Sequence, residues 1–314
     1  MKFIAYLFPI LLFSACSPGL ETSRPTPENR EASLKSLVAT EIRFDSLSVS
    51  GGHKMAFLRF LADSSILFRP GPVNGKKWYA AQKESKGTLK WTPDLADVSA
   101  SGDLGYTVGP FSFQPDTIPC SNRMAGCSWG YYVGIWQRTN PGDWKLVLNY
   151  GVRSSHEEKI EHPDIHPLVV PDTTMTPGLP QAWTIDSVFA LESSWPDTSK
   201  KDKWTFNDRM VAAMHPQASL YRTNQHPKKV EFNNQDFDWF ISGTAGFPTI
   251  EPMGGAMSAA GDLAYTYGLI TVYNSNYVPY PEPYYYVNIW QKDSSGKFRL
   301  IFNLANRQPA MKKK

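Results

Sequence analysis

The stretch "SASGDLGYTVG" at Ser99–Gly109 decides the fold, because the chain repeats it as "SAAGDLAYTYG" at Ser258–Gly268. Three further motifs recur in the same order: "SILFRP" and "SLYRT" (from Ser65 and Ser219), "YYVGIWQR" and "YYVNIWQK" (from Tyr131 and Tyr285), and "LVLNYG" and "LIFNLA" (from Leu146 and Leu300). Four motifs in one register, at a separation far longer than a solenoid repeat, indicate that a whole domain is duplicated. The sequence therefore predicts two tandem copies of one domain.

Each copy is predicted to combine helices with antiparallel strands. Apolar residues from Leu34 to Ile42 recur at three- and four-residue steps, which predicts a helix that ends at a pair of glycines. A second short helix, a strand from Ser65 and a polar helical piece follow, and then several strands joined by turns such as "SGD". Strand alternation places Tyr106 and Thr107 on opposite faces. The predicted fold class is α+β, with helices packed on one face of a curved antiparallel sheet.

The first sixteen residues resemble a bacterial lipoprotein signal. A short positive start precedes an apolar run that is too short to span a bilayer, and Ala15 and Cys16 follow that run. Phe13 departs from the usual leucine at its position, and an ordinary secretory signal cleaved nearby is the alternative. We expect lipidation of Cys16, and hence an extracytoplasmic protein of a bacterial cell envelope that is anchored to the membrane by a lipid.

Two cysteines remain in copy one if Cys16 carries a lipid. Cys120 and Cys127 flank a short polar stretch that contains a glycine. In an oxidising compartment, two spare cysteines this close in sequence usually pair. The alternative is two free thiols in the cytoplasm, and the signal segment argues against it. We therefore expect a disulfide between them.

The charge of the chain gives no support for a nucleic-acid partner. The formal net charge is +3 over 314 residues, and the lysine clusters are short. Nucleic-acid binding would require basic residues gathered on one face. We therefore expect no nucleic-acid partner.

These patterns divide the chain into five segments: a signal segment at 1–16, a polar and proline-rich tether at 17–30, a first domain at 31–153, a linker at 154–180 and a second domain at 181–310. The linker contains His156, His162 and His166 among acidic residues. A metal site is one interpretation, but the spacing fits no rigid ligand frame and His-Pro pairs favour extended backbone. We expect a solvated linker, with no metal site and no cofactor.

Copy one resembles the nuclear transport factor 2-like superfamily, in particular its small bacterial domains of unknown function related to polyketide cyclases. The resemblance rests on "FLADSSILFRPGPVNGKKW", "VSASGDLGYTVG" and "YYVGIWQR" with "DWKLVLNYG", and it is weaker in copy two. It implies two tandem cone-shaped domains, in each of which a bent sheet wraps a pocket that helices close. It also implies that the copies pack as an internal pseudo-dimer through their sheet faces, as dimers of the superfamily do.

The resemblance also allows catalysis to be tested on the residues. Ketosteroid isomerase, a member of the superfamily, needs a carboxylate base near the end of the first strand and a buried acid on a later strand. This chain has Arg69 and Arg222 at the first position, and Gly134 and Asn288 at the second. Dehydratases of the superfamily use a histidine paired with an aspartate, and the candidate His53 is not repeated in copy two. We therefore expect no catalytic residue.

Binding of a small molecule or a protein partner is the expected function. Arg69 and Arg222 fall at equivalent strand ends where the cone opens, and they could hold a carboxylate or phosphate. The aromatic side chains expected to line the pockets are Trp91, Tyr106, Trp136, Tyr265 and Trp290. The alternative is that the aromatics are ordinary core and the arginines form ion pairs. Two other functions stay open, an isomerase-, dehydratase- or cyclase-type enzyme and a pure interaction scaffold.

The lipid anchor is tested by Cys16→Ser. A thioether-linked lipid requires the cysteine sulfur, so cells grown with a labelled fatty acid should incorporate the label into the wild-type chain and not into the variant. Cys120→Ser is the control, because this cysteine lies outside the signal segment and its loss should leave the label in place. Labelled Cys16→Ser protein would contradict anchoring at this residue.

Overall fold

The computed structural model describes residues 27–116, 126–140, 143–155, 165–168, 183–197, 199, 203–229 and 246–307. Copy one contains α1 (Pro27–Gly51), α2 (His53–Phe60), β1 (Leu61–Phe68), β2 (Pro72–Asn74), α3 (Gly75–Ala81), β3 (Gly87–Trp91), β4 (Leu95–Val98), β5 (Leu104–Pro115), β6 (Ser128–Asn140) and β7 (Asp143–Ser154). Copy two contains α4 (Ile185–Ser193), α5 (Lys203–Ala213), β8 (Met214–Arg222), β9 (Lys228–Lys229), β10 (Phe247–Met257), β11 (Leu263–Tyr273), β12 (Tyr284–Lys292) and β13 (Phe298–Arg307).

The two copies form two separate sheets of matching topology. The first has the order β2-β1-β7-β6-β5-β3, with β4 also paired to β5, and the second has the order β10-β11-β12-β13-β8-β9. Each sheet is antiparallel except for one parallel pair, β1 with β7 and β8 with β13. The register of these parallel pairs is the same, since Leu67 lies opposite Asn149 and Leu220 lies opposite Asn303. The expected fold class, two tandem α+β domains with curved sheets, is confirmed.

The repeated motif ends in a glycine because each sheet bends at that point. A Cβ at Gly109 would lie 1.9 Å from the Thr92 carbonyl oxygen, and a Cβ at Gly268 would lie 2.3 Å from the Glu251 carbonyl oxygen. In copy one the partner of β5 changes here from β4 to β3, and in copy two β10 carries a bulge at this position. A bulge or break in one strand bends its partner, so only glycine allows the close approach that curves each sheet into a cone.

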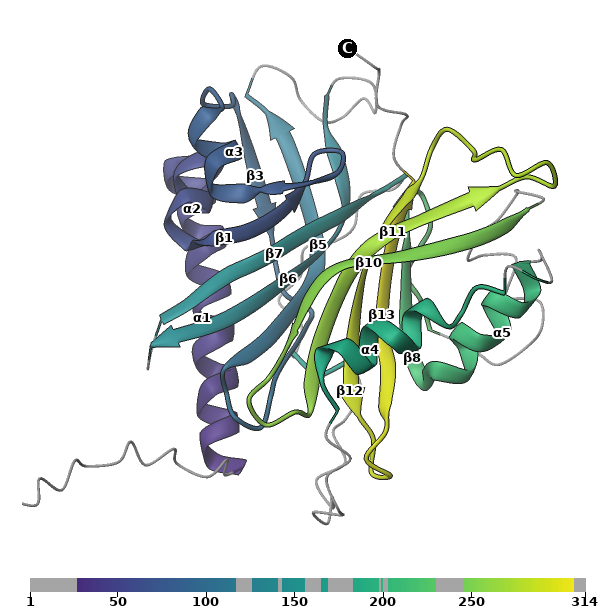
Figure 1. Ribbon diagram of the computed structural model, residues 1–314. Coiled ribbons are helices and arrows are strands. Elements are labelled where there is room, and N and C mark those ends of the chain that lie inside the picture. The colour runs from purple at the N-terminus through teal and green to yellow at the C-terminus, as the bar shows by residue number, and fades with distance from the viewer. Residues whose placement is uncertain are drawn as a thin grey trace, which may run out of the picture.

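The helices of the two copies lie on opposite outer sides of the molecule, and both sheets lie between them (Figure 1). Helix α1 packs on the outer face of the first sheet, where Leu37 and Phe44 are buried with Leu61, Trp91 and Trp136. Helices α4 and α5 cover the second sheet with a cluster that includes Val188, Trp195, Phe206, Met210, Leu300 and Trp290. Each copy therefore has its own core between its helices and its sheet.

The inner faces of the two sheets share a further apolar cluster. Its buried members come from both copies and include Leu104, Tyr106, Ile135, Leu263, Ile289 and Phe302. Strand alternation produces this third layer, because Leu104, Tyr106 and Val108 all point away from the helices of copy one. Of the linker, residues 154, 155 and 165–168 are described, and Leu168 is buried in the same cluster with its N–H donating to the Tyr106 hydroxyl.

The two repeated turns hydrogen-bond to each other across the copies. The Asp103 carboxylate accepts from the Ala259 N–H at 2.9 Å, and the Asp262 carboxylate accepts from the Ala100 N–H at 2.8 Å. The Ser101 hydroxyl also accepts from the Ala260 N–H at 3.0 Å. Each aspartate holds its own turn as well, through Ser99 in copy one and Ser258 in copy two. The repeated "GD" therefore shapes a turn in each copy and contacts the equivalent turn of the other.

Every helix that the structure describes is too short or too polar to span a membrane.

The turn contacts predict a stability loss for Asp103→Ala. The variant removes a charged acceptor from both its own turn and the Ala259 N–H, so we expect the free energy of unfolding to fall by about 1.5–3 kcal/mol. Thermal and urea unfolding measure this. Asp63→Ala is the control, because its exposed carboxylate pairs with Lys76 on the surface and its loss should change the melting temperature little. Equal stability of both variants would contradict the role of the turn contact.

Candidate functional site

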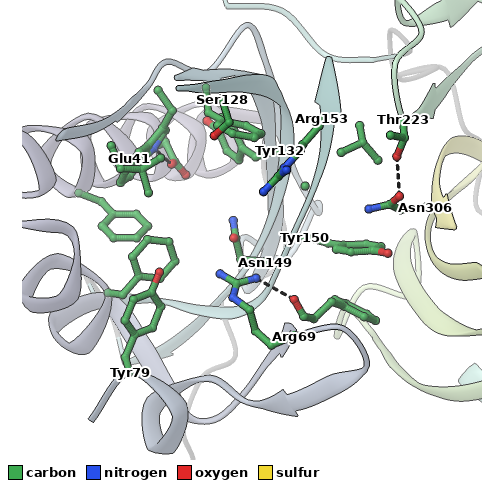
Figure 2. A pocket seen from close by; sticks show the side chains of 18 of the residues that line it. Glu41, Arg69, Tyr79, Ser128, Tyr132, Asn149, Tyr150, Arg153, Thr223 and Asn306 are labelled. Atoms are coloured by element: carbon green, nitrogen blue, oxygen red, sulfur yellow. Dashed lines mark hydrogen bonds between the residues drawn. The ribbon is translucent and has the colours of Figure 1, made fainter. Parts of the chain in front are cut away.

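A cavity of about 620 Å³ lies between the helices and the sheet of copy one (Figure 2). Aromatic side chains from α1, α2, α3, β3 and β6 form much of its wall, and they include Phe44, Phe57, Tyr79, Trp91 and Tyr132. Thr223, Asn306 and Arg307 of copy two also line it. The cavity is thus built mainly by copy one, with the second copy adding one side.

The Glu41 carboxyl is the most buried polar group of this cavity. Glu41 lies on α1 with an exposed fraction of 1%, and it points toward the sheet. One carboxyl oxygen accepts from the Trp91 indole N–H at 2.5 Å, and the other accepts from the Thr107 hydroxyl at 2.7 Å and the Trp136 indole N–H at 2.9 Å. Three strands therefore supply donors to one carboxyl on the helix.

Burial raises the pKa of Glu41 from 4.5 to about 7, against the lowering effect of its three donors. A charged carboxylate loses its hydration in this apolar site, and neutral donors restore only part of that loss. Near neutral pH the group therefore exists in both protonation states. It can donate a hydrogen bond as an acid or accept one as a carboxylate.

Copy two contains the same arrangement around Glu192 on α4. This carboxyl is fully buried and accepts from Thr266 and Trp290, which are the repeat equivalents of Thr107 and Trp136. It also accepts from the Tyr286 hydroxyl at 2.7 Å and the Asn288 amide at 2.7 Å. Burial raises the pKa of Glu192 as well. Helix α4 begins with a capping box at Thr184, which holds the first turn of the helix that presents Glu192.

The copies differ in how the equivalent tyrosine is bonded. Tyr132 of copy one is the equivalent of Tyr286, and its exposed fraction is 6%. Its hydroxyl has no hydrogen-bond partner among the described residues, and the nearby Thr107 hydroxyl, which bonds Glu41 and Trp136, acts on Tyr132 by lowering its pKa. Burial and the Glu41 carboxylate raise the pKa of Tyr132, so its hydroxyl keeps its proton at neutral pH. Copy one therefore has a buried donor beside its carboxyl.

Two guanidinium groups lie at the more exposed part of the cavity. Figure 2 shows Arg69 and Arg153 pointing into it, with the Asn149 side chain close by. Arg69 donates to the Phe68 carbonyl at 2.7 Å and lies over the Trp78 ring. Within the described part of the chain, neither Arg69 nor Arg153 forms an ion pair, whereas Arg307 pairs with Glu282 at 2.9 Å.

The residues expected from the sequence fall into different environments. Arg69 and Trp91 line the cavity, and Trp136 and Trp290 donate to the buried glutamates. Arg222 is buried and donates to the carbonyls of Tyr221 and Asn303, at 2.8 and 3.2 Å. Its burial lowers the pKa of the guanidinium to about 9. Tyr106 and Tyr265 lie on the inner sheet faces, on the side away from the glutamates.

The residues expected from the sequence do not include Glu41, Tyr132 or Arg153. A usable signal existed for Arg153, because Arg307 occupies the equivalent place after the repeated "LVLNYG" and "LIFNLA" motifs. Glu41 carried no such signal, since a glutamate inside an amphipathic helix is normally solvated. Asp45, the aspartate nearest to the His53 candidate in the sequence, accepts from the Trp91 N–H at 2.9 Å.

Only some of the cysteines and candidate metal ligands expected from the sequence lie within the described residues. Cys127 is disulfide-bonded, while Cys16 and Cys120 lie outside the described residues. Of the linker histidines, His166 is described and its carbonyl accepts from the Ala96 N–H. No group of three or more metal-binding side chains occurs within the described ranges.

Comparison with known proteins gives matches among solved structures alone. No protein-family model matches the chain, and no curated protein matches it. A conserved protein from Planctomyces limnophilus is 16% identical, with a TM-score of 0.30, over 40% of this chain and 99% of that one. A nuclear transport factor 2-like superfamily protein from Salmonella enterica is 13% identical, with a TM-score of 0.30, over 49% and 99%. A putative scytalone dehydratase from Novosphingobium aromaticivorans is 9% identical, with a TM-score of 0.33, over 44% and 97%.

The raised pKa of Glu41 predicts a pH-dependent effect of Glu41→Gln. The folded state holds this proton more tightly than the unfolded state. The free energy of unfolding of the wild-type protein therefore falls as pH rises from about 4.5 to about 7. The glutamine does not titrate, so the variant should gain stability relative to wild type across this window. Urea unfolding at several pH values measures the difference. Glu31→Gln on the exposed face of α1 is the control and should keep the wild-type profile; a pH-independent difference for Glu41→Gln would contradict the raised pKa.

Proposed function

We propose that this protein binds a small, largely apolar molecule with an acidic group in the cavity of copy one, and that it does so without catalysis. The observation that carries the proposal is the pair Arg69 and Arg153, which point into an aromatic-walled cavity without an ion-pair partner among the described residues. A guanidinium near an apolar cavity favours a carboxylate or phosphate as its partner.

The size and lining of the cavity support a small-molecule ligand. Its volume of about 620 Å³ lies within the usual range for ligand pockets, which is roughly 300–1,000 Å³. Phe44, Phe57 and Trp91 offer flat apolar surfaces, and such rings stack well on a planar ligand. An aromatic or otherwise flat acid is the ligand class that this lining favours.

The copy-two arrangement supports binding over catalysis. Glu192 has the same threonine and tryptophan donors as Glu41, and Tyr286 and Asn288 also donate to it. A carboxyl held in this way in both copies ties a helix to a sheet, which is a structural role. The second candidate is a proton-transfer enzyme, which the near-neutral pKa of Glu41 in the cavity wall favours.

We further propose that the chain is anchored through Cys16 outside the cytoplasm and that its copies act as an internal pseudo-dimer. The apolar run before Cys16 supports the anchor. The apolar cluster and the reciprocal aspartate contacts support the paired copies. The lining of the cavity by Thr223 and Asn306 is consistent with a binding site that needs both copies.

The binding site is tested with 2-naphthoate as the acidic probe and naphthalene-2-carboxamide as its neutral match. We expect Arg69→Ala and Arg153→Ala each to weaken naphthoate binding by about 1–1.5 kcal/mol, or roughly five- to tenfold in Kd, because each removes one partner of the carboxylate. Titration calorimetry measures binding, and the melting temperature should change little.

The control is Arg59→Ala, an exposed arginine on α2 outside the cavity lining, which should bind naphthoate like wild type. Equal affinity for the acid and the amide would contradict an anion site. Conversion of a bound probe into a product, lost in Glu41→Gln, would instead favour the enzyme. A co-purifying protein together with a cavity that binds neither probe would favour an interaction scaffold.

A further inference from the structure

The buried end of the copy-one cavity contains an unused hydrogen-bond donor. The Tyr132 hydroxyl is buried, keeps its proton and has no partner among the described residues. Buried hydroxyls almost always have a partner, and leaving one unpaired costs free energy. Tyr132 lines the cavity with Glu41, so the missing partner has room to enter as part of a ligand.

The equivalent tyrosine and glutamate of copy two show how these two groups bond when they meet directly. There the equivalent hydroxyl, that of Tyr286, donates directly to Glu192 at 2.7 Å. In copy one the equivalent groups, Tyr132 and Glu41, are not hydrogen-bonded to each other. Glu41 instead lies in the wall of a cavity of about 620 Å³. The same two groups are thus joined in one copy and separated in the other. A ligand group placed between Tyr132 and Glu41 would restore the connection.

The hydrogen-bonding capacity of Glu41 matches such a group. Among the described residues, the carboxyl oxygen that accepts from Trp91 has this one donor, while the other oxygen has two. A carboxylate oxygen can accept two hydrogen bonds, so one acceptor position is left. A ligand hydroxyl can donate to that position and accept from Tyr132 in the same pose, whereas a carbonyl can only accept and an ammonium group can only donate.

We propose that Glu41 and Tyr132 form a second polar subsite, which takes a hydroxyl at the end of the ligand remote from its acidic group. This inference rests on the proposed function, in which Arg69 and Arg153 hold the acid at the exposed part of the cavity. Phe44, Phe57 and Trp91 line the space with these groups and favour a flat apolar body. The ligand class is then a hydroxylated aromatic acid with its two polar groups at opposite ends.

The test compares 6-hydroxy-2-naphthoate with 2-naphthoate in the full-length protein, by titration calorimetry. We expect the hydroxyl to tighten binding about tenfold in wild type, the effect of one good hydrogen bond. In Tyr132→Phe this gain should fall to about threefold or less, because one of the two contacts is lost. Naphthoate binding is measured in each variant as well, so that the gain is the ratio of the two Kd values within the same protein.

Tyr286→Phe is the matched control in copy two. It removes a hydroxyl that already donates to Glu192, so it should lower the melting temperature and leave the tenfold gain in place. Tyr132→Phe should leave the melting temperature nearly unchanged, because within the described part of the chain its hydroxyl has no partner to lose. The two variants therefore separate a binding role from a structural one.

Three results would overturn the subsite. A tenfold gain that persists in Tyr132→Phe would show that the hydroxyl binds elsewhere. Equal binding of the two acids by wild type, with binding still dependent on Arg69, would remove the subsite and leave the proposed function standing. Absence of binding by both acids up to millimolar concentration would overturn the proposed function, and the subsite with it.

Discussion

A buried carboxyl between a helix and a sheet is the constraint on which each copy depends. Glu41 on α1 accepts from Trp91 on β3, Thr107 on β5 and Trp136 on β6, so one side chain joins the helix to three strands. A buried carboxyl without these donors would be strongly unfavourable. The helix can therefore sit over the sheet only where the donors meet it, and that placement sets the space in which the cavity lies.

The duplicated domain uses this constraint in two ways. In copy two, Tyr286 and Asn288 add hydrogen bonds to Glu192, and the carboxyl is surrounded by donors. In copy one, glycine replaces that asparagine at Gly134, and the Tyr132 hydroxyl is left without a partner among the residues that the structure describes. The same scaffold thus has a densely bonded centre in one copy and an open one in the other. Duplication followed by this divergence separates a supporting copy from a binding copy in the function we propose.

The contact between the copies follows from the alternation of the same strands. On β5, Thr107 faces the helix and Glu41, while Tyr106 and Val108 face the other sheet. One strand therefore contributes both to the carboxyl site and to the shared apolar cluster. The turn that begins this strand carries Asp103, whose carboxylate reaches the Ala259 N–H of the other copy. Because Thr223 and Asn306 also reach the cavity, the packing of the copies and the shape of the cavity are linked.

The sequence by itself determined the duplication, the fold class and the alternation of the strands, because these depend on local patterns that repeat in register. It also identified Arg69 and Trp91 as cavity residues, yet the equivalent Arg222 is buried against backbone carbonyls. Only the tertiary structure decided this difference, and only it brought Glu41 to Tyr132. The donors of Glu41 come from positions as far as Trp136 in the chain, and no spacing rule connects a helical glutamate with side chains on three strands. Long-range packing sets whether such a group is solvated, bonded or open to a ligand.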